Sequence, residues 1–156
     1  MRLSSDAARR LFAAGCISLC AGLIYWAFRS ASLDDFDSYN FARALTEFAP
    51  ARFQPHPPGY VLYVWLGKAA LAIAGDARLA LVSLSVVSAA LACGLVFVAV
   101  SGLIHARAAL CVVLLMAATP LLWLNADKAL SDAPALLAQV VCFAGIALAV
   151  KRQLPA

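Results

Sequence analysis

Charged residues are scarce in this chain. Asp, Glu, Lys and Arg make up only 13% of its 156 residues, whereas soluble domains carry about 25%. Hydrophobic residues make up 65%, which is more apolar surface than a water-soluble globule of this size can bury. The net charge of +4 is small and gives no indication of nucleic-acid binding. The composition excludes a soluble domain and predicts a protein whose main solvent is the bilayer.

Cysteine is present but absent from the polar segments. All five cysteines lie within apolar runs, so they cannot build a loop disulfide, and they are best interpreted as small packing residues. No zinc-ligand spacing, Gly-rich phosphate loop or Ser/His/Asp set occurs. We therefore expect no metal site and no required cofactor, although Asp34, Asp35 and Asp37 could together hold a divalent cation.

Long apolar runs are the main feature that is present. The runs without charge are residues 11–28, 79–104, 108–126 and 133–150. Because a transmembrane helix needs about 20 apolar residues, the sequence predicts an all-α, polytopic membrane protein with four transmembrane helices in a single membrane domain, 1–156. Pro120, near the end of the third run, predicts a kink there.

The distribution of charge predicts the topology. The N-terminus, the short loop before the third run and the C-terminus carry Arg2, Arg9, Arg10, Arg107, Lys151 and Arg152, with Asp6 as the one acid. The positive-inside rule then places both termini in the cytoplasm of a bacterial inner membrane and residues 29–78 in the periplasm. An alternative is that the first run is a cleaved signal peptide, but Tyr25 and Trp26 resemble an interfacial anchor and favour an uncleaved helix.

The polar loop 29–78 has a helical pattern of its own. Residues 37–48 repeat apolar side chains at helical spacing and predict an amphipathic helix, which Asp35 or Asp37 could cap. Residues 60–74 predict a second helix, which we expect to be interfacial or re-entrant because it is short and contains Lys68. A proline-rich stretch holds the chain extended between the two helices.

Three motifs in this order resemble a known family. They are the acidic pair Asp34-Asp35 followed by Ala42-Arg43, the segment His56-Pro57-Pro58-Gly59-Tyr60, and the segment Ser131-Asp132-Ala133-Pro134. Together they resemble membrane glycosyltransferases of the GT-C fold, and more narrowly the protein O-mannosyltransferase and aminoarabinose-lipid A transferase group. The resemblance covers nearly the whole chain, which would then be the N-terminal part of such an enzyme. It departs from the family at Ser38, where an aromatic is expected, with Tyr39 displaced by one; Asp37 is an additional acid that could replace Asp35 in register.

The resemblance implies an activity and a set of partners. Enzymes of this group transfer a sugar from a polyprenyl-phosphate carrier to a hydroxyl of a lipid, glycan or protein acceptor at the extracytoplasmic face. Asp34 and Asp35 take the catalytic positions, where a carboxylate can accept the proton of the attacking hydroxyl. Cationic side chains can neutralise the phosphate leaving group. The residues expected to bind substrate are Asp37, Arg43, Arg52, His56, Tyr60, Lys68, Lys128 and Asp132.

Simpler interpretations exist for the same residues. Asp132 could cap the fourth span, His56 could be structural, Tyr60 could be an interface anchor, and Arg43 could form a solvated pair with Glu47. For the whole chain, the alternatives are a non-enzymatic membrane module, such as a transporter subunit or assembly partner, or an inactive truncation. The absence of ionisable residues from the four apolar runs argues against an ion pathway.

Overall fold

The computed structural model describes residues 5–153, and these residues form seven α-helices and one short 3₁₀ helix, with no strand beyond an isolated bridge between Ala49 and Gln54. The expected all-α class is confirmed. The elements are α1 (Ser5–Ala27), α2 (Phe36–Ala44), η1 (Pro50–Arg52), α3 (Val61–Ala74), α4 (Ala77–Ser101), α5 (Ala106–Ala117), α6 (Pro120–Ala126) and α7 (Asp132–Gln153).

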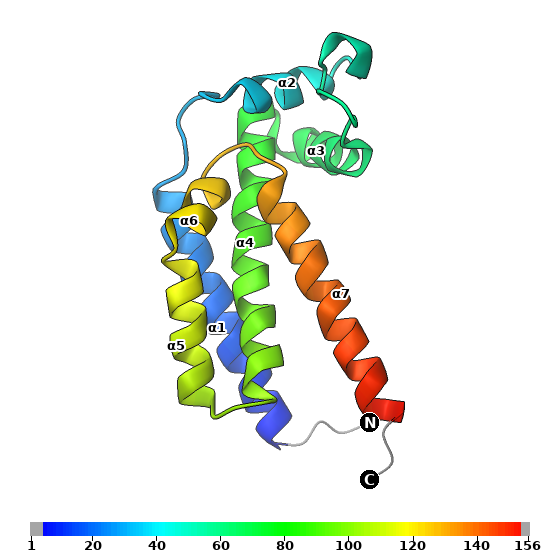
Figure 1. The fold of residues 1–156 in the computed structure, drawn as a ribbon. Coiled ribbons are helices and arrows are strands. Elements are labelled where there is room, and N and C mark those ends of the chain that lie inside the picture. The colour runs from blue at the N-terminus through cyan, green and yellow to red at the C-terminus, as the bar shows by residue number, and fades with distance from the viewer. Residues whose placement is uncertain (1–4, 154–156) are drawn as a thin grey trace.

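Helix α4 forms the centre of a bundle in which α1, α5 and α7 run alongside it (Figure 1). Many of its core-facing residues are small, and Ala80, Ala89 and Ala92 are fully buried. A Cβ atom added at Gly94 would lie 2.8 Å from the backbone oxygen of Ala14, so the backbones of α1 and α4 are in close contact. Small residues at helix contacts are typical of membrane bundles. In lipid the hydrophobic effect does not drive helices together, and small residues allow the close van der Waals packing that does.

Two helices, α1 and α4, are long and apolar enough to cross a membrane. Helices α5 and α6 make a third span only if they are counted together, since they are bent by 64° at their break. The apolar part of α7 whose side chains are described, Asp132–Ile146, is shorter than a full span. Of the four transmembrane helices expected, two, or three with the bent pair, are thus candidate spans among the described residues, and four are not confirmed.

The break between α5 and α6 has a clear local cause. Pro120 has no backbone N–H to donate and begins α6, and the Thr119 hydroxyl accepts the N–H of Leu122 at 3.4 Å as an N-cap. The hydroxyl of Tyr25 on α1 donates to the carbonyl oxygen of Ala117 at 2.9 Å, at the end of α5. The kink expected at Pro120 is thus a complete interruption of the helix.

The polar loop folds over one end of the bundle as α2, η1 and α3 (Figure 1). The first loop helix ends at Ala44, so the expectation of a helix through residue 48 was wrong. Proline at position 50 disfavours helical geometry at Ala49, and Ala49 pairs with Gln54 instead, its N–H donating to the Gln54 oxygen at 2.7 Å. The second loop helix, α3, matches the expected segment 60–74 within one residue, because Tyr60 adopts a left-handed conformation (φ 43°) just before it.

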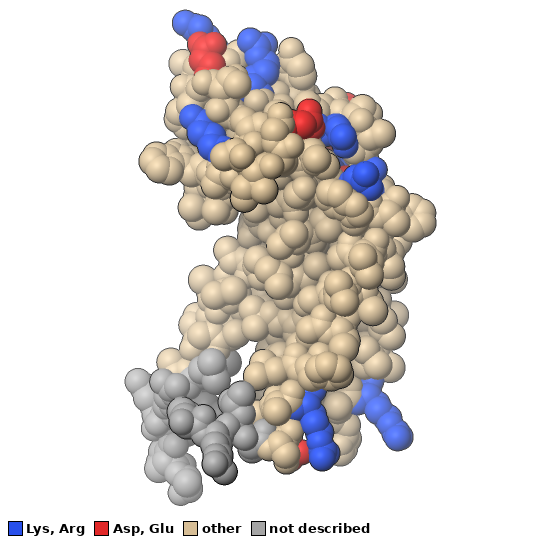
Figure 2. Space-filling model, turned by 180° about the vertical axis from the view of Figure 1, so that it is seen from behind, with Lys and Arg blue, Asp and Glu red and all other residues tan. Residues whose placement is uncertain are grey.

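Charged side chains gather at the two ends of the molecule, and the body between them is uncharged on the face shown in Figure 2. Large apolar side chains cover that body, and Phe12, Leu19, Leu115 and Phe143 are each more than 60% exposed. Exposed apolar surface of this extent marks an interaction with another apolar phase. The arrangement fits helices that present their apolar faces to a bilayer.

Candidate functional site

The residues singled out from the sequence are concentrated at the end of the bundle opposite the termini. Four segments meet there: the connection between α1 and α2, the start of α2, the turn before α3, and the loop between α6 and α7 (Figure 1). Two of them are bonded directly to α4: Arg78 donates to the Ser30 carbonyl oxygen at 2.9 Å, and the Ser85 hydroxyl donates to the Leu130 carbonyl oxygen at 2.9 Å.

Asp35 contacts Lys128 across two of these segments. The Nζ atom of Lys128 lies 3.0 Å from Oδ2 of Asp35, and both side chains are roughly a third exposed (31% and 40%). The bond to Asp35 raises the pKa of Lys128, so the amine remains cationic. Asp35 occupies the N-cap position of α2, but its side chain makes no capping hydrogen bond. The structure thus places Asp35 as the partner of a lysine rather than as a helix cap.

Asp34 is held by two serine hydroxyls. Ser30 Oγ donates to one carboxylate oxygen of Asp34 at 3.2 Å, and Ser32 Oγ donates to the other. The backbone of Ser30 is itself fixed: its N–H donates to the Asp127 carbonyl at 2.8 Å, and its carbonyl accepts from Arg78 Nη1 at 2.9 Å. Sequence reasoning missed these supporting residues, although alternating serines ahead of an aspartate are a recognisable signal for a side-chain-bonded turn.

Asp37, His56 and Tyr60 form a chain of polar contacts. His56 Nδ1 lies 3.2 Å from Asp37 Oδ1, and His56 Nε2 lies 3.1 Å from the Tyr60 hydroxyl. Phe41 packs edge-on against the rings of Tyr60 and Tyr63, at centroid distances of 5.2 Å and 4.8 Å. The helix α2 therefore contacts the proline-rich turn through the Asp37–His56 contact and one aromatic cluster.

Tyr63 lies beneath this chain and is 5% exposed. Burial raises the pKa of its hydroxyl. The nearby Ser85 side chain lowers this pKa, and the negative charge of Asp132 raises it further. The hydroxyl of Tyr63 is therefore a neutral donor at any physiological pH, in the field of Asp132.

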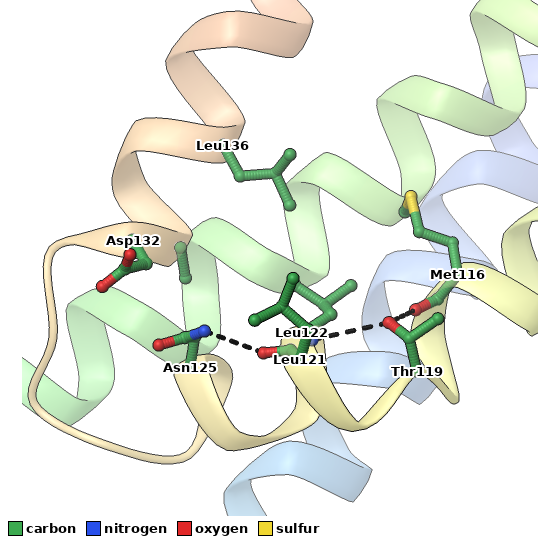
Figure 3. Close-up of a pocket in the computed structure, with 8 residues that line it drawn as sticks. Met116, Thr119, Leu121, Leu122, Asn125, Asp132 and Leu136 are labelled. Atoms are coloured by element: carbon green, nitrogen blue, oxygen red, sulfur yellow. Dashed lines mark hydrogen bonds between the residues drawn. The ribbon is translucent and has the colours of Figure 1, made fainter.

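An apolar groove of about 280 Å³ opens between the α5–α6 break and α7 (Figure 3). Met116 and Leu136 line it from opposite sides, and Asn125 and Asp132 form its polar edge (Figure 3). The amide of Asn125 donates to the Leu121 carbonyl at 2.8 Å, which fixes that edge. The groove combines a hydrocarbon-like lining with a carboxylate at its end, next to the loop that carries Lys128.

Three of the expected phosphate-binding cations lie elsewhere. The guanidinium of Arg43 stacks over the Tyr39 ring at 5.7 Å, on the exposed side of α2. Arg52 forms an exposed ion pair with Glu47 at 2.9 Å, so Glu47 does not pair with Arg43 as the simpler interpretation assumed. Lys68 is exposed on α3. Within residues 5–153, the structure gives none of these cations a contact with Asp34 or Asp35.

The three acids at positions 34, 35 and 37 have separate partners: serine hydroxyls, a lysine and a histidine. Among the described residues, no group of three or more His, Cys, Asp or Glu side chains could hold a metal ion. Comparison of the chain with protein-family models, with curated proteins and with solved structures found no match. The family resemblance therefore rests on the three sequence motifs alone.

Proposed function

We propose that this chain is a membrane glycosyltransferase of the GT-C type, or the N-terminal part of one, which transfers a sugar from a polyprenyl-phosphate carrier to an acceptor hydroxyl. The supporting observation is that all three motif segments lie at one end of the bundle. The ion pair between Asp35 and Lys128 links the first segment to the loop before the third, and the contact between Asp37 and His56 links it to the second.

The proposed reaction needs a base and a cation. The acceptor oxygen attacks the anomeric carbon while the bond from that carbon to the carrier phosphate breaks, and the electron pair leaves with the phosphate. The proton of the acceptor passes to a carboxylate, for which Asp34 and Asp35 are the candidates. Asp34 is exposed and is oriented by two hydroxyls, and Lys128 supplies the positive charge for the leaving phosphate.

The position of the site suits a lipid substrate. The carrier's phosphate resides at the membrane interface, and the candidate site lies at a charged end of a molecule whose body is apolar (Figure 2). We further propose that this end is periplasmic and that both termini are cytoplasmic. Reporter fusions test the orientation: a phosphatase fused after Gly75 should be active, and one fused after Ile104 should be inactive.

A transfer assay on the full reading frame tests the activity. Membranes carrying the wild type, Asp34→Asn or Asp35→Asn are supplied with radiolabelled polyprenyl-phosphate sugars, and Asp6→Asn at the opposite end serves as the matched control. Loss of the base should lower the rate by about 100-fold or more in at least one variant, with Asp6→Asn unaffected.

The outcomes separate the proposal from its alternatives. Wild-type rates in both variants would overturn the catalytic assignment. A wild type without transfer from any donor would overturn the activity and favour a non-enzymatic membrane module.

A further inference from the structure

A second groove, of about 370 Å³, lies between α1, α4 and α5. Its lining is almost entirely apolar: Cys16 and Ile17 come from α1, Phe97 from α4, and Leu110 from α5. Arg107, at the start of α5, is the one charged residue that borders it. Its lining residues at the start of α5 and the end of α4 belong to the end of the bundle opposite α2 and α3 (Figure 1). The groove is thus separate from the candidate glycosyl-transfer site.

The charge around this groove is of one sign. Arg107 is exposed and makes no ion pair with any residue in 5–153, and Arg9 and Arg10 are also exposed at this end. The one acid that the structure describes here is Asp6. An apolar groove bordered by a free guanidinium is complementary to a molecule with a hydrocarbon chain and an anionic head.

We propose that this groove binds an anionic phospholipid of the bilayer, with an acyl chain against Ile17 and Leu110 and the headgroup phosphate at Arg107. Helices α1 and α4 are long and apolar enough to cross a membrane, so a groove between them and α5 lies within reach of the acyl chains of lipids. A guanidinium binds phosphate oxygens in a bidentate manner, which favours Arg107 as the headgroup contact. This inference does not depend on the proposed transferase activity.

Fluorescence quenching by brominated lipids tests the site. Trp26, Trp65 and Trp123 are replaced by Phe, and Leu110→Trp supplies a single reporter inside the groove. The protein is placed in vesicles of phosphatidylcholine mixed with phosphatidylglycerol, with bromine on one lipid or the other. Quenching should show that phosphatidylglycerol is preferred at the reporter, and Arg107→Gln should reduce that preference by about five-fold. Arg107→Lys should retain most of it.

Arg43→Gln, at the opposite end of the molecule, is the matched control and should leave the preference unchanged. Because the attraction is electrostatic, added salt should weaken the preference in the reporter protein. Native mass spectrometry of the unsubstituted chain in a mixture of both lipids gives an independent measure if the tryptophan replacements impair folding. Equal quenching by the two lipids, an unchanged preference in Arg107→Gln, or a reporter that neither lipid reaches would overturn the proposal.

Discussion

The Nζ atom of Lys128 lies 3.0 Å from Oδ2 of Asp35, and this ion pair connects the loop between α6 and α7 to the residue that precedes α2. Both side chains are partly exposed, so water screens the attraction and the pair contributes only about 0–1 kcal/mol to stability. Its main effect is positional: it places an ammonium group beside a candidate catalytic acid.

Replacing Lys128 by Met should lower the free energy of unfolding by no more than about 1 kcal/mol at neutral pH. Asp35 raises the pKa of Lys128 above the ordinary value of 10.5. Stability from the pair is therefore fully present below that value and is lost as the pH rises through the folded-state pKa. Denaturant unfolding in micelles at neutral and at strongly alkaline pH measures this. Lys68→Met is the exposed control, and a difference from wild type that persists after lysine deprotonates would contradict the expectation.

The coupling energy between Asp37 and His56 should be larger than the coupling energy between Arg52 and Glu47. The His56 side chain is 25% exposed, whereas those of Arg52 and Glu47 are 72% and 57% exposed, and screening grows with exposure. A double-mutant cycle with Asp37→Asn and His56→Gln should give a coupling energy of about 1 kcal/mol. Equal or smaller coupling than in the Arg52→Gln and Glu47→Gln cycle would show that the histidine contact is as weak as a surface pair.

Gly94→Ala should destabilise the bundle by about 1–3 kcal/mol through overpacking. The added Cβ would lie 2.8 Å from the Ala14 carbonyl oxygen, a backbone atom that cannot rotate away. Gly15→Ala is the matched control on α1, because nothing lies within 4 Å of its added Cβ, and it should be neutral or slightly stabilising. Unfolding in mixed micelles compares the two variants. Similar stabilities would mean that α1 and α4 are not in close backbone contact.

Leu136→Trp should fill the groove between α6 and α7 and raise the KM for a lipid-linked donor, with a smaller effect on kcat. The groove is lined by apolar side chains and lies next to the loop that carries Lys128, so it is suited to the carrier's hydrocarbon chain. Leu115→Trp, at a position that is 72% exposed and outside the groove lining, is the control. An unchanged KM in an active Leu136→Trp enzyme would exclude this groove as the carrier site without affecting the assignment of the transfer reaction.

Local sequence features predicted much of the fold. The apolar runs predicted α1 and α4, and the short apolar stretch predicted α3 within one residue. Pro120 predicted a kink in the third run, where the structure has a break between two helices. The error at α2 is instructive: apolar spacing continued to Phe48, but the helix ended at Ala44 because the pairing of Ala49 with Gln54 required the chain to turn.

The candidate site was predictable as a set of residues but not as a set of contacts. The sequence analysis named Asp35, Asp37, His56 and Lys128 as candidate site residues, yet their pairing depends on how separate segments of the chain pack together. Side-chain contacts across long sequence separations carry no periodic signal, so a single sequence does not specify them. The same limitation explains why Arg52 was grouped with the phosphate-binding cations, whereas the structure pairs it with Glu47.

The hydrogen bond from the Tyr25 hydroxyl to the Ala117 carbonyl oxygen means that the end of α5 is held by a side chain of α1. Proline at position 120 leaves carbonyl groups at the end of α5 without their helical donors, and an unsatisfied carbonyl in hydrocarbon costs several kcal/mol. The Tyr25 hydroxyl donates a hydrogen bond to one of these carbonyl groups. Tyr25 belongs to α1, which is far from α5 in the sequence. Removing that hydroxyl would therefore leave a carbonyl group at the bend without a donor, through a change at a residue far from it along the chain.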